Sequence, residues 1–257
     1  MDGFLSAAKK IVSEAGLMAK KMLSSSHIRD HKQHGDVVTD GDICVENHVI
    51  SSLEKLFPNH GFDSEEMGQK NADAEYVWIL DPIDGTKYYN KDMPLYAVSL
   101  ALKQRGKETP ILGVVYSPEF NRMYSAGIGK GAALNGRPIY CSDVDRLEDA
   151  SICLEIPSRD SSSAELQWAM EKMSVLVRHA YRVRIIGVGS LGLCFCAMGG
   201  FDAYVNLGCL WKPCDHAAGR VIIREAGGEF SYLGKQGRQI VAGPTALCNE
   251  IRTILNV

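Results

Sequence analysis

Residues 78–86 of the chain read WILDPIDGT, and this stretch decides the fold. The apolar run at 76–80 predicts a buried β-strand that stops where Asp81 begins a turn. Pro82 restricts the backbone between two carboxylates, those of Asp81 and Asp84. Acidic oxygens that converge at the end of a strand suit a hard cation such as magnesium. For this segment alone, the alternative is a turn in which both carboxylates only accept hydrogen bonds from backbone N–H groups.

Helix and strand patterns alternate on both sides of this segment. Apolar residues recur every three or four positions over 3–23, which predicts an amphipathic helix, and a second helix follows a short strand at 36–39 and ends at Pro58. Further strands are predicted at 96–102, 111–116, 122–126, 152–154, 182–186 and 203–206, and further helices at 163–178, 190–198 and 215–226. This mixture indicates an α/β or α+β sandwich rather than a helix bundle or a barrel.

A polar segment at 141–149 separates two halves of this pattern. We predict an N-terminal α+β half over 1–145, which carries the main acidic motifs, and a C-terminal α/β half over 146–257. A chain of 257 residues is long enough for two closely joined halves with a sizeable core.

The composition is that of an ordinary globular enzyme, with 46% apolar residues, 23% charged residues and a formal net charge of -3. A nucleic-acid binder usually carries a basic excess, so we expect no nucleic-acid partner. No apolar run reaches the roughly 18 residues that a membrane-spanning helix needs, and residues 1–16 mix charges into their apolar pattern. We therefore expect a cytoplasmic protein without a membrane partner.

The eight cysteines lie mostly inside apolar stretches, and we expect them to be buried, reduced thiols. They are Cys44, Cys141, Cys153, Cys194, Cys196, Cys209, Cys214 and Cys248. A zinc site is the alternative interpretation for four of them, although their spacing does not match the usual paired cysteine knuckles. These four are Cys194, Cys196, Cys209 and Cys214.

Two further acidic segments strengthen the magnesium interpretation. Glu65 and Glu66 are adjacent in a predicted loop, which by itself indicates no more than a solvated acidic turn. Asp215 begins a predicted helix, where a carboxylate ordinarily caps the first turn. Small and apolar residues at 217–222 predict that this helix is buried, so Asp215 is held in place and can reach a shared site.

Together, these motifs resemble the inositol monophosphatase family of lithium-sensitive, magnesium-dependent phosphatases. The acidic pair at 65–66, the signature DPIDGT at 81–86 and the late Asp215 occur in the family's order. The stretch GDVVTDGD at 35–42 resembles the family's N-terminal element, and the match spans about residues 30–230. The resemblance implies an α/β/α/β/α sandwich that is commonly dimeric, so we expect a homodimer.

The resemblance also implies how two or three magnesium ions are held. Glu65, Asp81 and the backbone carbonyl of Ile83 hold one ion in this scheme. Asp81, Asp84 and Asp215 hold a second, and Glu65 helps to hold a weaker third ion through water. Magnesium prefers oxygen ligands and keeps several waters, and the phosphate of the substrate completes its coordination.

The same resemblance implies a mechanism without a covalent phosphoenzyme. Thr86, hydrogen-bonded to Asp42, orients the attacking water and helps to deprotonate it, with Glu65 nearby. The N–H groups of Gly85 and Thr86 bind the phosphate at the start of a helix. Lys32 occupies a position where some family members place a lysine near the metals.

Residues that are expected to lie near the substrate depart from the family pattern. Inositol monophosphatases usually continue the signature with Thr-Asn-Phe, whereas 87–89 read Lys-Tyr-Tyr, which resembles the branch that acts on nucleotide bisphosphates. Lys212, followed by a proline, resembles histidinol-phosphate phosphatases, and Asn206 stands where a glutamate often contacts inositol hydroxyls. We expect five residues to contact the substrate, namely Asp84, Gly85, Thr86, Asn206 and Lys212.

The leading prediction is therefore a phosphoric monoester hydrolase that acts on inositol monophosphate or a similar polyol phosphate. The same chemistry on a sugar bisphosphate, a 3′,5′-nucleotide bisphosphate or histidinol phosphate is the nearest alternative. A catalytically inactive family member that binds phosphate ligands is a more remote one, because the metal carboxylates and Thr86 are all present.

Overall fold

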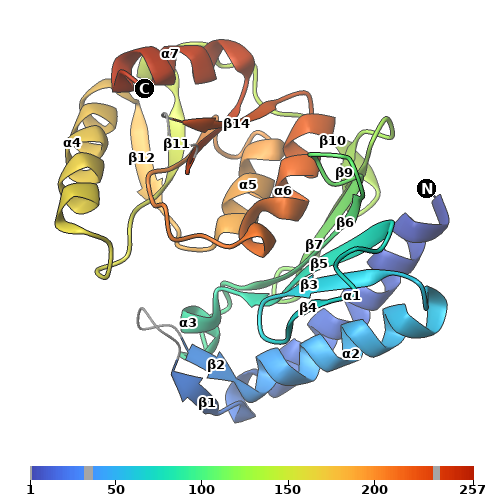
Figure 1. The fold of residues 1–257 in the computed structure, drawn as a ribbon. Helices are drawn as coiled ribbons and strands as arrows, with labels where there is room; N and C mark the ends of the chain where they lie inside the picture. The colour runs from blue at the N-terminus through green and yellow to red at the C-terminus, as the bar shows by residue number, and fades with distance from the viewer. Residues whose placement is uncertain (1, 32–36, 234–237) are drawn as a thin grey trace.

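The computed structural model describes residues 2–31, 37–233 and 238–257. Five layers stack in the order helix, sheet, helix, sheet, helix (Figure 1), which confirms the predicted sandwich. Lys32 and the first two residues of the 35–42 motif lie outside the described residues, so the predictions for them stay untested.

The first layer consists of two helices, α1 (Asp2–Met22) and α2 (Asp40–Leu56), which pack side by side on one face of the larger sheet (Figure 1). Both helices bury an apolar stripe against the central strands of that sheet, as the sequence pattern predicted. The short 3₁₀ helix η1 (Leu23–Ser25) ends α1, and an antiparallel pair of strands, β1 (Ile28–His31) and β2 (Val37–Thr39), leads into α2.

α2 begins at a capping box that fixes Asp42 in its first turn. The N–H of Thr39 donates to Asp42 Oδ2 at 2.8 Å, and the N–H of Asp42 donates to Thr39 Oγ1 at 3.4 Å. Both residues are completely buried. Neighbouring residues of the sequence therefore hold this carboxylate in place.

The larger sheet has eight strands in the order β10-β9-β8-β7-β6-β5-β3-β4. Their bounds are β3 (Gly61–Ser64), β4 (Gly68–Lys70), β5 (Tyr76–Asp84), β6 (Ala97–Gln104), β7 (Leu112–Ser117), β8 (Arg122–Gly127), β9 (Ala132–Leu134) and β10 (Arg137–Ile139). β3 and β5 run parallel, with Ser64 opposite Leu80, whereas the other neighbouring strands are antiparallel. The carboxyl ends of β3 and β5 therefore meet at one edge of the sheet.

β5 extends further than the sequence predicted. The prediction ended this strand at Asp81, but it continues to Asp84 and shifts its register against β6. Asp81 lies opposite Ser99, and Asp84 lies opposite Ala97, so one extra residue is inserted on β5. Pro82, which has no N–H to donate to a sheet, falls inside this β-bulge. A bulge, rather than a turn, therefore directs the two carboxylates.

The second half of the chain forms a smaller sheet and its covering helices. Its five strands have the order β12-β11-β13-β15-β14. Their bounds are β11 (Ser151–Glu155), β12 (Arg182–Ile185), β13 (Ala203–Asn206), β14 (Glu229–Leu233) and β15 (Gln239–Gly243). The helices α5 (Gly189–Ala197) and α6 (Pro213–Glu225) lie between the two sheets, and α4 (Ser163–His179) and α7 (Thr245–Leu255) cover the outer face (Figure 1). The described residues also contain two further short helices, α3 (Thr86–Tyr89) after β5 and η3 (Leu147–Asp149) before β11.

Some elements were not predicted. The prediction contained nothing after 228, where β14, β15 and α7 follow, and it lacked the short strands β1, β3, β4, β9 and β10. These short strands have three or four residues each, too few for an alternating pattern to stand out. The helices and strands that were predicted are present in the described residues.

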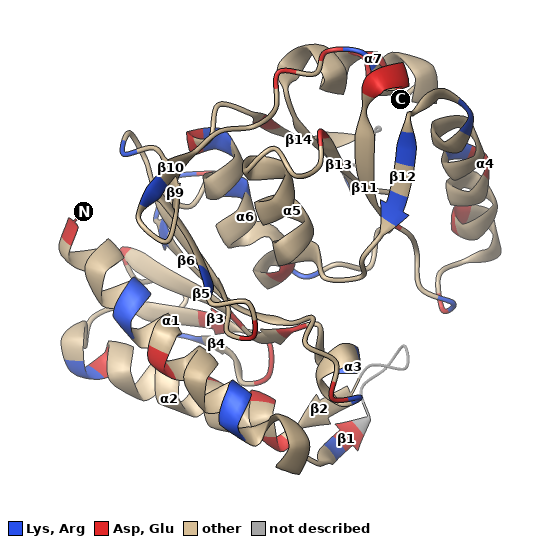
Figure 2. Ribbon diagram, turned by 180° about the vertical axis from the view of Figure 1, so that it is seen from behind, with Lys and Arg blue, Asp and Glu red and all other residues tan. Residues whose placement is uncertain are grey.

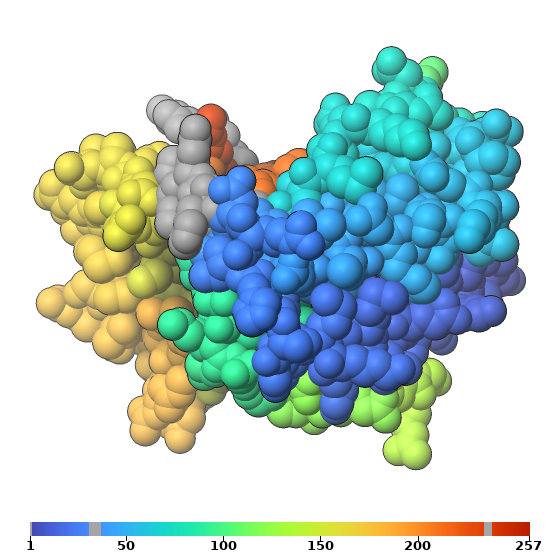
Figure 3. Space-filling view, turned by 90° about the horizontal axis from the view of Figure 1, so that it is seen from below, coloured from blue at the N-terminus to red at the C-terminus, as the bar shows by residue number. Residues whose placement is uncertain are grey.

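The two sheets divide the chain between Ile139, the last residue of β10, and Ser151, the first residue of β11. The predicted division after residue 145 lies in this interval and stays a prediction. A space-filling view from below shows a hollow at the upper edge of the molecule, with orange atoms of the second half at its base and cyan atoms of the first half on one side (Figure 3). Within the described ranges, no helix combines the length and the apolar character that crossing a membrane requires.

α6 approaches both β7 and α5 closely because glycines lie at the contacts. A Cβ on Gly113 of β7 would lie 2.4 Å from the carbonyl oxygen of Ala218 and 2.7 Å from its Cα. A Cβ on Gly219 would lie 2.5 Å from Leu193 Cδ1 of α5. These contacts fix α6 between the sheets, and with it the position of Asp215 in its first turn.

We predict that Gly113→Ala lowers the free energy of unfolding by about 1–3 kcal/mol, because the added methyl group overlaps backbone atoms of α6 that cannot rotate away. Gly127→Ala is the matched control, since this glycine also lies in a strand and its nearest neighbour is 3.8 Å from an added Cβ. Denaturant unfolding followed by circular dichroism measures both variants. Equal stability of the two contradicts the close contact between β7 and α6.

Candidate metal centre

The residues that the sequence predicted to hold magnesium line one cavity, named the metal cavity below. Its volume is about 170 Å³, and it lies where the ends of β3 and β5 meet the start of α6. Its lining residues are Glu65, Asp81, Ile83, Asp84, Gly85, Thr86, Lys87, Gly187 and Asp215. Figure 2 shows acidic segments near the ends of β3 and β5 on the side that faces the acidic start of α6. The fold thus brings acidic motifs from both halves of the chain to one place.

Glu65 and Asp81 come from neighbouring parallel strands. Glu65 directly follows β3, and its N–H donates to the carbonyl oxygen of Leu80 at 3.1 Å. The pairing of β3 with β5 therefore places Glu65 beside Asp81. Asp81 is 3% exposed, and its Oδ1 has no hydrogen-bond partner among the described residues. A buried polar atom without a partner costs about 1–3 kcal/mol, and more when it is charged, so this oxygen is suited to bind a cation.

The starts of the two helices between the sheets orient two more carboxylates. Asp84 Oδ2 accepts a hydrogen bond from the N–H of Ser190, in the first turn of α5, at 2.7 Å. Asp215 Oδ2 accepts one from the N–H of Lys212 at 2.8 Å and so caps α6. For Asp84 and for Asp215, a backbone N–H group at the start of a helix binds one carboxylate oxygen. This hydrogen bond fixes the side chain and so sets the direction of the other oxygen.

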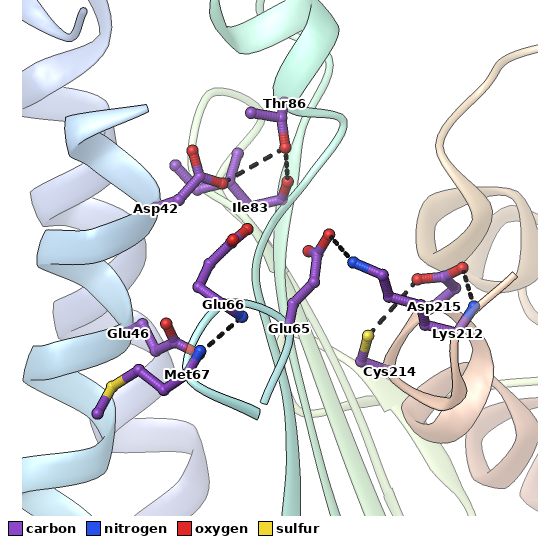
Figure 4. A network of polar contacts seen from close by, with 10 residues as sticks. All are labelled: Asp42, Glu46, Glu65, Glu66, Met67, Ile83, Thr86, Lys212, Cys214 and Asp215. Atoms are coloured by element: carbon purple, nitrogen blue, oxygen red, sulfur yellow. Dashed lines mark hydrogen bonds and ion pairs between the residues drawn. The ribbon is translucent and has the colours of Figure 1, made fainter. Parts of the chain in front are cut away.

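The side chain of Lys212 reaches across the centre to Glu65 (Figure 4). Its Nζ lies 3.0 Å from Glu65 Oε1, and the two side chains are 45% and 10% exposed. This ion pair joins the turn before α6 to the end of β3. An ammonium group therefore balances one of the clustered carboxylates in this structure.

Burial makes the charged forms of these carboxylates unfavourable. It raises the pKa of Asp84 to about 6 and the pKa of Asp215 to about 7. The pKa of Asp81 lies well above its ordinary value, first because the side chain is buried and then because neighbouring carboxylates, Glu65 foremost, add negative charge. A divalent cation at this place offsets both causes.

The donor atoms at the centre fit a hard cation. Ligand atoms of Glu65, Asp81 and Cys214 lie within 4.8 Å of one another. The sulfur of Cys214 is a soft ligand, which magnesium does not prefer, and burial, followed by the charge of Asp81, raises the pKa of this thiol well above its ordinary value. The remaining donors are carboxylate oxygens and the carbonyl of Ile83, which are the ligands that magnesium prefers.

The eight cysteines are free, and six of them are buried, as predicted; Cys44 is exposed and Cys141 is partly buried. The alternative zinc site has no support in the part of the chain that the structure describes. The only group of potential metal ligands found there contains just one member of the four-cysteine set, Cys214.

Thr86 lies between Asp42 and the metal cavity (Figure 4). Its Oγ1 is 2.8 Å from the carbonyl oxygen of Ile83 and 3.4 Å from Asp42 Oδ1, so the hydroxyl can donate to either acceptor. Burial raises the pKa of Asp42 to about 7, which lets this carboxyl group exchange a proton near neutral pH. Gly85 precedes Thr86 with φ 98°, a left-handed conformation that favours glycine and turns the chain into α3.

A larger cavity of about 470 Å³ adjoins the metal cavity. The two share Asp84, Lys87, Gly187 and Asp215 as lining residues. Glu155, at the end of β11, also lines the larger cavity, and the sequence analysis missed it. Its carboxylate accepts a hydrogen bond from the N–H of Gly187 at 3.1 Å, and burial raises its pKa to about 7. The available signal was an acidic residue directly after a predicted strand, the same signal that marks Asp81.

Two predicted substrate residues line the larger cavity but have protein partners. Asn206 is 7% exposed; its Oδ1 accepts from the N–H of Gly208 at 2.8 Å, and its Nδ2 lies 3.4 Å from His216 Nε2. Its amide group thus holds a turn. Lys212 contacts Glu65 at the metal centre. The substrate roles of Asn206 and Lys212 stay predictions.

Comparisons with known proteins connect this geometry to a family. Residues 1–254 match the profile of the inositol monophosphatase family. The Aquifex aeolicus protein named fructose-1,6-bisphosphatase/inositol-1-monophosphatase is 33% identical over 248 residues, which cover 95% of this chain and 92% of the relative. The putative Nus factor SuhB of Neisseria meningitidis serogroup B is 35% identical over 263 residues, which cover 99% of this chain and 98% of the relative.

Solved structures share the fold over nearly the whole chain. The extragenic suppressor protein SuhB from Bartonella henselae has a TM-score of 0.90 and 25% identity, with 98% of each chain covered. The inositol monophosphatase from Anabaena (Nostoc) has a TM-score of 0.84 and 27% identity, with 99% of this chain and 96% of that chain covered. By its match to the family profile over almost its full length, this chain belongs to the inositol monophosphatase family.

Proposed function

We propose that this chain is a magnesium-dependent phosphatase, which hydrolyses a small-molecule phosphate monoester with a metal-activated water. Membership of the inositol monophosphatase family supports a phosphatase activity. The observation that carries the metal assignment is the cavity in which four carboxylates meet, with Asp81 Oδ1 buried and unpartnered among the described residues.

Magnesium is the cation that this family generally uses. We assign one ion to Glu65, Asp81 and the carbonyl of Ile83. A second ion is assigned to Asp81, Asp84 and Asp215, and a weaker third to Glu65 through water. Bound magnesium supplies a water of lowered pKa and stabilisation of the leaving oxygen.

Thr86 and Asp42 are assigned to the transfer of the proton. Thr86 Oγ1 lies at the wall of the metal cavity, where it orients the attacking water. Asp42 Oδ1, 3.4 Å from that hydroxyl, accepts the proton, and a pKa of about 7 suits this role near neutral pH. Glu65 is a second acceptor at the same cavity, and the N–H groups of Gly85 and Thr86 are assigned to the phosphate.

The larger cavity is assigned to the alcohol part of the substrate. Inositol monophosphate or a similar polyol phosphate is the leading candidate, because the carboxylate of Glu155 and the amide of Asn206 offer polar groups to hydroxyls. Lys87 and Lys212 line the same cavity, so a substrate with a second anionic group, such as a sugar bisphosphate or a 3′,5′-nucleotide bisphosphate, is the nearest alternative. The name of the Aquifex aeolicus relative joins a bisphosphatase to a monophosphatase. Histidinol phosphate is a further candidate.

Several expectations stay predictions, namely lithium sensitivity, the homodimer, the cytoplasmic location and the absence of a nucleic-acid partner. The relatives do not support the expectation of no nucleic-acid partner, since the one from Neisseria meningitidis is named a putative Nus factor.

A catalytically inactive homologue that binds phosphate ligands is the remaining alternative. Such a protein would release no phosphate in the next experiment.

Phosphate release from inositol 1-phosphate is predicted to require Mg²⁺ and to stop in excess chelator. Asp81→Asn is expected to lower kcat about 10³-fold, more than any other single ligand variant, because Asp81 is assigned to both ions. Asp145→Asn, which changes an exposed side chain, is the matched control. Activity that survives chelation or Asp81→Asn contradicts the assignment. Fructose 1,6-bisphosphate, adenosine 3′,5′-bisphosphate and histidinol phosphate in the same assay identify the substrate class.

Thr86→Ala is predicted to keep the affinity for Mg²⁺ and for inorganic phosphate but to lower kcat by about 10²–10⁴-fold, since the hydroxyl is assigned to the water and the backbone N–H to the phosphate. Thr86→Ser restores a hydroxyl at this position and is expected to recover most of the turnover. Calorimetric titrations and a phosphate-release assay measure the two properties separately. Weakened phosphate binding with normal turnover of bound substrate excludes this role.

The metal-free protein is predicted to lose stability as the pH rises. The pKa values of Asp84, about 6, and of Asp42 and Asp215, about 7, lie above the ordinary value for aspartate. The folded state therefore holds these protons more tightly than the unfolded state, so the contribution is complete below about pH 4 and is lost as the pH rises to about 7. Bound Mg²⁺ offsets the negative charge and is expected to restore the stability.

Differential scanning calorimetry between about pH 5 and 8, with chelator or with Mg²⁺, measures this dependence. Asp215→Asn removes one of the responsible groups and is expected to weaken the slope, whereas Asp145→Asn is expected to leave it unchanged. A Tm that depends on neither pH nor Mg²⁺ is incompatible with a buried, cation-binding cluster of carboxylates.

A further inference from the structure

Lys212 lies at the boundary between the metal cavity and the larger cavity. Its N–H donates to Asp215 Oδ2 at 2.8 Å, which anchors its backbone at the start of α6. Its Nζ lies 3.0 Å from Glu65 Oε1 (Figure 4), and the residue also lines the larger cavity. A flexible side chain on a fixed backbone can therefore place its ammonium at the metal centre or in the larger cavity.

Glu65 is the carboxylate that the ammonium contacts and a metal ion needs. Its side chain is 10% exposed, so water solvates it only weakly and it gains strongly from a cation. One of its oxygens lies in the group, within 4.8 Å of ligand atoms of Asp81 and Cys214, in which a metal ion fits. The ion pair with Lys212 therefore involves a carboxylate of the proposed metal site.

A divalent ion among these carboxylates also repels the ammonium. Both groups are positively charged, and their repulsion is strong at a separation of a few ångströms in a site that holds little water. Metal loading thus removes the advantage of the Lys212–Glu65 contact and leaves the larger cavity as the place where this side chain finds an anion.

We infer that Lys212 competes with Mg²⁺ for Glu65 and, once metal is bound, turns to an anionic oxygen of the substrate in the larger cavity. The inference rests on the proposed metal site. The same ammonium then weakens the binding of Mg²⁺ to the free protein and strengthens the binding of phosphate to the loaded protein. Lys212 is in this sense a positioning residue that couples metal loading to substrate binding.

Two other roles for Lys212 lead to different results. If Lys212 only links the turn before α6 to β3, its replacement lowers the stability of the fold. It then does not change the affinities for Mg²⁺ and for phosphate in opposite directions. A lysine that stays on Glu65 Oε1 while a metal uses the other oxygen leaves the affinity for Mg²⁺ unchanged.

Calorimetric titration of MgCl₂ into the chelator-stripped protein tests the competition. Lys212→Met keeps the length of the side chain without its charge and is expected to bind Mg²⁺ about 10- to 100-fold more tightly, the range for a hydrogen bond to a charged group. Lys212→Arg keeps the charge and is expected to stay close to the unmodified chain. Lys91→Met is the control, because Lys91 is exposed and lines neither cavity, and it is expected to change the affinity less than about 3-fold.

Titration of inorganic phosphate into the Mg²⁺-saturated protein tests the second step. Lys212→Met is expected to weaken phosphate binding about 10-fold. An unchanged or weaker affinity for Mg²⁺ in Lys212→Met, an equal tightening in Lys91→Met, or unchanged phosphate binding overturns the inference. Circular dichroism checks the folding of each variant, and Lys212→Gln replaces Lys212→Met if the latter fails to fold. If the unmodified chain binds no Mg²⁺ at all, the proposed metal site itself is wrong.

Discussion

The burial of Asp81 is the constraint on which the site depends. This carboxylate lies on a central strand, is 3% exposed and has one oxygen without a partner among the described residues. Three more carboxylates line the same small cavity, so their charges repel one another where little water can screen them. Such an arrangement is unfavourable for the chain alone and becomes favourable with a cation. Without a metal, Lys212 supplies one positive charge through Glu65, and a hard divalent ion at the oxygen donors would take over this role with a larger charge.

The fold holds these carboxylates together through contacts that do not involve a metal. Parallel pairing of β3 with β5 sets Glu65 beside Asp81, and the β-bulge directs Asp84 toward the first turn of α5. Glycines at 113 and 219 let α6 pack closely between the sheets, which brings Asp215 to the same cavity from the second half of the chain. The larger cavity is lined by residues of both halves, so the arrangement of the two sheets determines the shape of the space beside the carboxylates.

The alternating helix and strand patterns predicted a mixed sandwich, and the resemblance of short motifs to the family implied its five layers and the residues that line the metal cavity. Asp81 follows an apolar run, and Asp215 precedes a stretch that is buried as a helix. The β-bulge could not be predicted from the local sequence, since Pro82 is equally compatible with a turn. The contact between Lys212 and Glu65 joins residues 147 positions apart and depends on tertiary packing. Glu155 likewise acquires its place only when β11 and the loop at Gly187 come together.

The most direct test of a metal-binding carboxylate cluster is anomalous diffraction from crystals soaked with MnCl₂ and inorganic phosphate, with Mn²⁺ as an anomalous stand-in for Mg²⁺. We expect at least two anomalous peaks within about 2.5 Å of carboxylate oxygens, one shared by Glu65 and Asp81 and one shared by Asp81 and Asp215. The ammonium of Lys212 is expected to have moved away from Glu65 in these crystals. Crystals that bind phosphate but show no anomalous peak at Asp81 exclude a metal-binding role for this carboxylate cluster.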